Sequence, residues 1–67
     1  MTQEPTRLLV AQACKQAGLY FGPTTRLVEV TPNVYRFVSE QATTAGAYRQ
    51  YVFHAIVKDY EVNIERV

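Results

Sequence analysis

Hydrophobic positions follow two different periods along the chain. Near the N-terminus they recur at helical spacing, which predicts an amphipathic helix with one buried stripe. The stripe consists of Leu9, Val10, Ala13, Cys14 and Ala17. Thr2 can cap the start of this helix, and Pro5 is tolerated in its first turn. Gly18 followed by Leu19 is typical of a helix end.

From residue 25 onward the period changes to that of strands. Segments 25–30, 34–40 and 47–57 are rich in β-branched and aromatic residues, and segment 58–67 alternates apolar with polar positions. Segment 47–57 also fits helical spacing in part. Its Tyr, Val, Phe and Ile content, with few good helix formers, favours a strand.

Two short turns set the predicted registers. A turn at residues 32–33 pairs Val30 with Tyr35, and the last hairpin turns at residues 58–59. Both hairpins then place their large apolar side chains on one face of the sheet. The predicted members of this face are Val28, Val30, Tyr35, Phe37, Tyr51, Phe53, Ala55, Val57, Tyr60, Val62 and Ile64.

The helical stripe would cover that apolar face. We therefore predict a single α+β domain over residues 1–67, in which an N-terminal helix packs on one face of a four-stranded antiparallel meander. The order of one helix followed by four strands is similar to that of cystatin-like modules. The resemblance concerns element order alone, because the chain carries none of the sequence motifs of those families.

Chain length changes the expectation about stability. With 67 residues, the chain buries only about 60% of its unfolded surface, so its core is small. The single cysteine, Cys14, excludes an internal disulfide, and one cysteine with one histidine cannot supply the four ligands of a structural zinc site. We expect no metal and no cofactor. A partner surface or self-association would then supply additional stability.

Charge and hydropathy narrow the class of protein. Seven basic and six acidic residues give a net charge of +1, which is not the signature of a nucleic-acid-binding chain. No apolar run approaches the roughly 20 residues of a membrane span, and the N-terminus lacks the features of a signal peptide. We expect a soluble cytoplasmic protein with no membrane association.

Catalytic chemistry finds little support in the sequence. In the predicted register His54 points away from the helix, whereas Cys14 lies on the buried stripe, so the two do not form a dyad. The acidic residues are scattered, and the three glycines form no phosphate-binding loop. We expect that the chain is not an enzyme.

The sheet face away from the helix carries the strongest functional signal. Antiparallel sheets usually present polar residues to solvent, but this face mixes Leu27, Val34, Val38, Val52 and Ile56 with polar residues. Such a patch with a polar rim is typical of a protein-binding surface. The residues predicted to contact a partner are Arg36, Val38, Val52, His54, Ile56 and Lys58.

The sequence thus predicts a non-catalytic protein-interaction module, such as an adaptor, an inhibitor or an accessory subunit. Its contact could be heteromeric or a homodimer, and both remain open. The alternative is a small nucleic-acid-binding regulator that uses Arg36 and Arg49 with neighbouring tyrosines. Near-neutral charge and strand alternation, which sends Tyr35 and Arg36 to opposite faces, place this alternative second.

Overall fold

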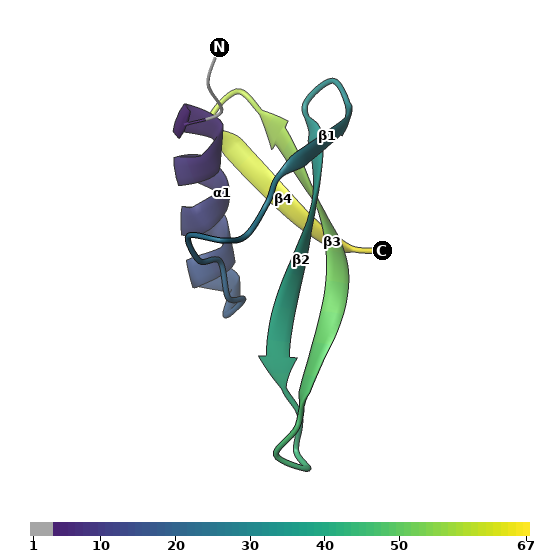
Figure 1. The fold of residues 1–67 in the computed structure, drawn as a ribbon. Helices are drawn as coiled ribbons and strands as arrows, with labels where there is room; N and C mark the ends of the chain where they lie inside the picture. The colour runs from purple at the N-terminus through teal and green to yellow at the C-terminus, as the bar shows by residue number, and fades with distance from the viewer. Residues whose placement is uncertain (1–3) are drawn as a thin grey trace.

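One helix lies against one face of a four-stranded sheet in this computed structural model, which describes residues 4–67 (Figure 1). The elements are α1 (Glu4–Ala17), β1 (Val28–Thr31), β2 (Val34–Ala42), β3 (Tyr48–Lys58) and β4 (Glu61–Arg66). All neighbouring strands are antiparallel, and their order in the sheet is β1-β2-β3-β4. The predicted α+β fold class is confirmed.

Helix α1 ends as its sequence predicts. Gly18 adopts a φ of 76°, and its N–H donates to the carbonyl of Lys15, while Leu19 N–H donates to the carbonyl of Cys14. These two bonds define a Schellman motif, which needs the left-handed conformation that glycine adopts without strain. The predicted cap at Thr2 lies outside the described residues.

The helical stripe supplies one side of the core. Val10 and Cys14 have no exposed surface, Leu9 and Ala13 are half-buried, and Ala17 at the end of the stripe is exposed. Helix α1 packs over β3 and β4. The stripe prediction therefore holds for its middle and is wrong for its last residue.

Aromatic rings form the centre of the core. Phe37 and Phe53, which are cross-strand partners on β2 and β3, stack with ring centroids 5.6 Å apart. Phe21, from the segment that connects α1 to β1, packs edge-on against Phe37 at 5.8 Å. The buried hydrophobic residues are Val10, Cys14, Leu27, Phe37, Phe53 and Ala55.

Arg7 fastens the connecting segment to the helix. Its guanidinium donates to the carbonyl of Thr25 at 2.6 Å and to that of Gly22 at 3.0 Å, and it lies 4.8 Å from the centre of the Phe21 ring. Thr25 Oγ1 accepts a bond from Gly22 N–H at 3.0 Å. These contacts fix a segment that has no regular secondary structure of its own.

The first hairpin corrects a predicted register. Thr31 pairs with Val34 across the two-residue turn, but an irregularity follows, so that Val28 pairs with Arg36 in place of Phe37. The two faces of β1 are therefore exchanged: the side chains predicted to point toward the helix point away from it. Leu27, expected on the outer side, is buried at 7% exposed, whereas Val28 and Val30, expected in the core, are 55% and 41% exposed.

The last hairpin has a milder error. It turns at Asp59 and Tyr60, because Lys58 pairs with Glu61, and Asp59 carries the positive φ of 57° at the first turn position. Tyr60 is 86% exposed in this turn, so its predicted place in the core is wrong. Val62 and Ile64 still pack against the core, as predicted.

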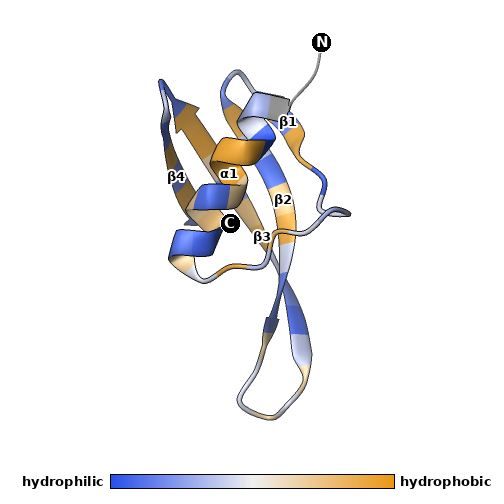
Figure 2. Ribbon diagram, turned by 90° about the vertical axis from the view of Figure 1, so that its left-hand side faces the viewer, coloured by the Kyte–Doolittle hydropathy of each residue, from blue (hydrophilic) through white to orange (hydrophobic). Residues whose placement is uncertain are grey.

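Strands β2 and β3 extend beyond the helix and the edge strands as a long hairpin (Figure 2). The protein consequently measures 40 × 20 × 20 Å along its principal axes. A tight loop closes the hairpin, with Gly46 N–H donating to the carbonyl of Thr43 and Thr43 N–H to that of Ala47. Gly46 has a φ of 83°, which favours glycine at this position.

Candidate functional site

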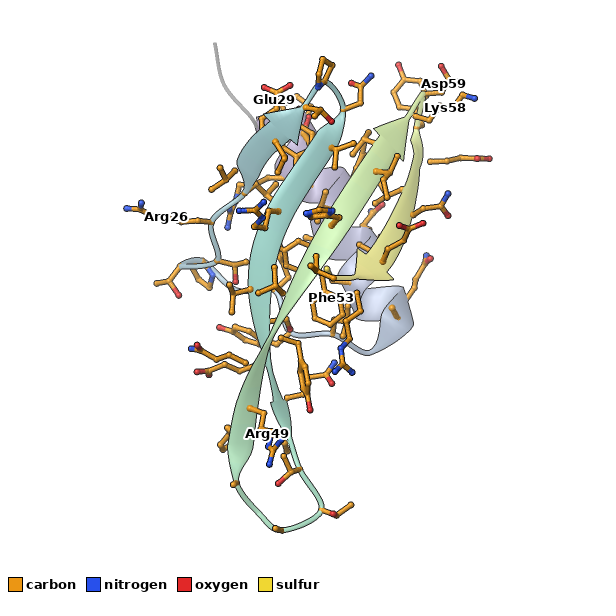
Figure 3. The ribbon with its side chains drawn as sticks, turned by 90° about the vertical axis from the view of Figure 1, so that its right-hand side faces the viewer. Arg26, Glu29, Arg49, Phe53, Lys58 and Asp59 are labelled. Carbon is orange, nitrogen blue, oxygen red and sulfur yellow. The ribbon has the colours of Figure 1, made fainter. Side chains whose placement is uncertain are left out.

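The sheet surface opposite α1 is open to solvent across all four strands (Figure 3). We call it the outer face. Cross-strand pairing defines its members, since side chains that lie directly opposite in neighbouring strands point to the same side. They are Val28 on β1, Val34, Arg36, Val38 and Glu40 on β2, Gln50, Val52, His54, Ile56 and Lys58 on β3, and Glu61, Asn63 and Glu65 on β4.

All six residues predicted to contact a partner lie on the outer face. Arg36 is the direct cross-strand neighbour of His54, and Val38 is that of Val52. The other two, Ile56 and Lys58, follow along β3 on the same side. The structure thus brings these six side chains together on one surface, and their role in binding stays a prediction.

Aliphatic side chains make this surface more apolar than a solvated sheet face usually is. Val28, Val38 and Val52 are 55%, 44% and 37% exposed, and Val34 and Ile56 are half-buried. Val38 and Val52 are direct cross-strand neighbours, and Val28 lies diagonally from Val38, beside Arg36. Val28 and Val38 also line one hollow, so the three exposed valines lie close together.

Charged groups cross the apolar patch in one row. Val28, Arg36, His54 and Glu65 are successive cross-strand neighbours from β1 to β4. The cation lies toward the β1 edge and the carboxylate lies on β4, with the imidazole between them. The Nε2 atom of His54 is buried and has no hydrogen-bond partner within residues 4–67.

A hollow of about 400 Å³ adjoins the outer face at its β1 side. Two arginines and one glutamate contribute to its lining, along with apolar side chains and Tyr20. The lining includes Tyr20, Arg26, Val28, Arg36, Val38 and Glu40. Figure 3 shows Arg26 at this margin of the sheet, well separated from Lys58 near the last turn.

Reactive groups are not gathered at one place. Cys14 lies on the side of α1 that packs into the core and is fully buried. Burial raises the pKa of its thiol from 9.0 to about 11. His54 lies on the opposite face of the sheet, so the two do not meet. Across the described residues, no three His, Cys, Asp or Glu side chains are grouped closely enough to hold a metal ion.

Helix α1, the one helix in residues 4–67, is too short and too polar to cross a bilayer.

The basic-aromatic pairs of the alternative prediction are spread over different surfaces. Arg36 lies on the outer face, but Tyr35 packs against the core. Arg49 pairs with Gln41 on the protruding hairpin. Gln41 lies five residues after Arg36 on β2, and side chains an odd number of residues apart point to opposite faces, so Arg49 and Gln41 lie on the other side of the sheet from Arg36. Tyr51 stacks with Arg66, whose guanidinium lies 4.3 Å from the ring centre.

Some residues of this surface were not predictable from the sequence pattern. Val28 was assigned to the core, and Tyr20 and Arg26 belong to a connecting segment whose path the alternation of strands does not predict. Glu65 is a polar position of the alternating segment 58–67, but its place in one row with His54 and Arg36 depends on the observed registers. The Pro-Asn turn was the available signal, because such turns disturb hairpin registers.

Comparison with known protein families, with curated proteins and with solved structures found no match for this chain.

Proposed function

We propose that the protein is a non-catalytic interaction module that binds a protein partner through the outer face. The observation that supports this proposal most directly is the open, connected patch of Val28, Val38 and Val52, exposed by 55%, 44% and 37%. Burying apolar surface stabilises an association by about 25 cal/mol per Å² before the costs of association are subtracted.

The surroundings of the patch support the same proposal. Arg36, His54 and Lys58 lie among the aliphatic groups and can supply hydrogen bonds and charge to a partner, as polar rims do in protein interfaces. The six buried hydrophobic residues of the core are few, so a bound partner would add stability. The lone reduced thiol of Cys14 suits a cytoplasmic location, which is part of the proposal.

Two charge insertions in the patch test this function. Val38→Glu and Ile56→Lys place a charge in the proposed contact, and neither residue belongs to the buried core. Both should reduce binding at least about tenfold, because an unpaired charge must be desolvated when the partner binds. Leu8→Lys is the matched control, since Leu8 is 65% exposed on α1.

The measurement compares partner retention on immobilised wild-type and variant chains, together with sedimentation of each chain alone. Circular dichroism checks that every variant is folded. Retention that Leu8→Lys preserves and both patch variants lose would support the proposal. Equal retention by folded patch variants would refute it, and salt-sensitive retention on single-stranded DNA would favour nucleic-acid binding.

A further inference from the structure

The outer face has an uneven distribution of charge from one edge of the sheet to the other. Arg36 on β2 and Arg26 at the adjoining hollow are basic, with Glu40 further along β2, whereas Glu61 and Glu65 on β4 are acidic. His54 separates Arg36 from Glu65 in one row. Since strands lie about 4.8 Å apart, the backbone positions of Arg36 and Glu65 are roughly 10 Å apart across the sheet.

We infer that the outer face binds the outer face of a second copy of this chain, about a two-fold axis that runs over β3 and parallel to it. This inference rests on the proposed function, because it names the partner of the same surface. A closed two-fold contact requires a surface that is complementary to itself.

The charge row selects the direction of the axis. Rotation about an axis along β3 exchanges the β2 side with the β4 side, so that Arg36 faces Glu65 of the second copy and Glu65 faces its Arg36. A perpendicular axis that passes over this same row would instead place Arg36 against Arg36 and Glu65 against Glu65. Facing like charges oppose association, so the axis along β3 is favoured.

The hollow at the β1 side adds to this complementarity. Glu65 of the second copy would approach the rim of the hollow, where Arg26 and Arg36 both contribute to the lining. Two guanidinium groups can donate charge-assisted hydrogen bonds to one carboxylate. Glu40 lies at the other end of this region and is hydrogen-bonded to Gln50 at 3.2 Å.

Apolar rows fit the same axis. Val67 N–H donates to the carbonyl of Val52 at 2.9 Å, which continues the pairing of β4, so Val38, Val52 and Val67 form one row across three strands. The rotation lays Val38 over Val67 of the second copy. Val52, His54 and Ile56 would each meet their own counterpart at the axis, so that the two imidazoles lie between two apolar pairs.

Lys58, which also lies on β3 at the axis, has a carboxylate beside it in the same chain. Lys58 would lie near Lys58 of the second copy at the end of the sheet, but Glu61 is its direct cross-strand neighbour in the same chain. The required area is also moderate. A stable interface covers about 800 Å² on each partner, which is about 15% of the accessible surface of 5218 Å².

Charge reversal tests the inference without changing the core. Sedimentation of the wild-type chain should show a dimer whose population rises with concentration. Arg36→Glu and Glu65→Arg should each weaken dimerisation at least about tenfold, because each creates two like-charge contacts in a symmetric dimer. The decisive sample is an equimolar mixture of the two variants, in which each reversed charge faces an opposite charge on the other chain. The mixture should form a heterodimer although each variant alone is monomeric.

A cysteine pair provides a second measurement that does not depend on charge. Val52→Cys should form a disulfide-linked dimer on mild oxidation, since position 52 meets its counterpart at the axis. Val28→Cys is the matched control, because Val28 is more exposed but lies two strands away from the axis. The wild-type chain, with Cys14 buried, should form no such link.

Three results would overturn the inference: a wild-type chain that stays monomeric at all concentrations, a mixture of the two charge variants that fails to associate, or equal cross-linking through positions 28 and 52. A monomeric chain that still retains a partner in a manner sensitive to Val38→Glu would leave the proposed function intact. The two proposals are thereby distinguished.

Discussion

Phe53 is the residue whose truncation should affect stability most. Its side chain is 6% exposed, and its ring stacks on Phe37 at 5.6 Å with an interplanar angle of 24°. Phe37 in turn carries the edge-on contact with Phe21. Phe53→Ala would therefore remove one member of a continuous aromatic cluster that joins both central strands to the connecting segment.

The magnitude follows from this burial. Replacing a buried phenylalanine by alanine costs about 3–5 kcal/mol. At about 0.05–0.15 kcal/mol per residue, a chain of 67 residues has a total stability of about 3–10 kcal/mol. Phe53→Ala should consequently remove between about a third and all of the free energy of unfolding.

Urea and thermal denaturation followed by circular dichroism measure the effect. Phe53→Leu keeps an apolar side chain and loses the ring stack, so it should cost about 1–2 kcal/mol and give a complete transition even where the alanine variant does not fold. Tyr60→Ala is the matched control, because Tyr60 is an aromatic residue that is 86% exposed. A Phe53→Ala melting temperature within about 4 °C of the wild type would refute the assigned core position, since 1 kcal/mol alone shifts it by about 4–8 °C.

Three further predictions concern the helix. Because burial raises the pKa of the Cys14 thiol from 9.0 to about 11, its thiolate fraction at pH 8 should be about 100-fold lower than that of an exposed thiol, and a thiol reagent should react rapidly only after denaturation; rapid native labelling would contradict this. Because the pKa is higher in the folded than in the unfolded chain, the contribution of the Cys14 thiol to the free energy of unfolding is complete below pH 9 and falls as the pH rises from 9 toward 11. The free energy of unfolding of Cys14→Ala should lack this pH dependence. Arg7→Ala should lower the stability by about 2 kcal/mol through loss of charged hydrogen bonds to Gly22 and Thr25, whereas Arg49→Ala on the exposed hairpin should leave the urea midpoint unchanged.

Local signals in the sequence were sufficient for the element types. The end of α1 was predictable because the Schellman motif needs a left-handed residue, and Gly18 supplies it at a φ of 76°. Strand β3 was predictable from composition, since its β-branched and aromatic residues outweighed a partial helical spacing. The end of α1 and the strand assignment of β3 both follow from residues that are close together in the sequence.

Long-range contacts were beyond such reasoning. Arg7 lies outside the apolar stripe of the helix, but its guanidinium binds carbonyl groups 15 and 18 residues further along the chain. No periodicity predicts where an irregular segment returns to the helix. The hollow beside the outer face is lined in part by the same segment. The sequence pattern therefore does not predict that Arg26 and Arg36 lie at one hollow.

The two register errors had unequal consequences for the site, and the parity of each shift explains the difference. Ala55 pairs with Ile64 where Val62 was predicted, a shift of two residues that leaves every β4 side chain on its predicted face. Val28 pairs with Arg36 where Phe37 was predicted, a shift of one residue that exchanges the two faces of β1.

The cause of the single-residue shift lies in the first turn. Pro32 at its first central position, followed by Asn33 with a φ of 69°, has the sequence and sign of a type II turn, whose twist does not match that of the flanking strands. The irregularity between Glu29 and Thr31 accommodates this mismatch. It also turns Leu27 into the core and Val28 outward, and thereby extends the row of Arg36, His54 and Glu65 to all four strands. A conventional primed turn at residues 32–33 would have kept Val28 inside and left the outer face without its apolar margin beside Arg36.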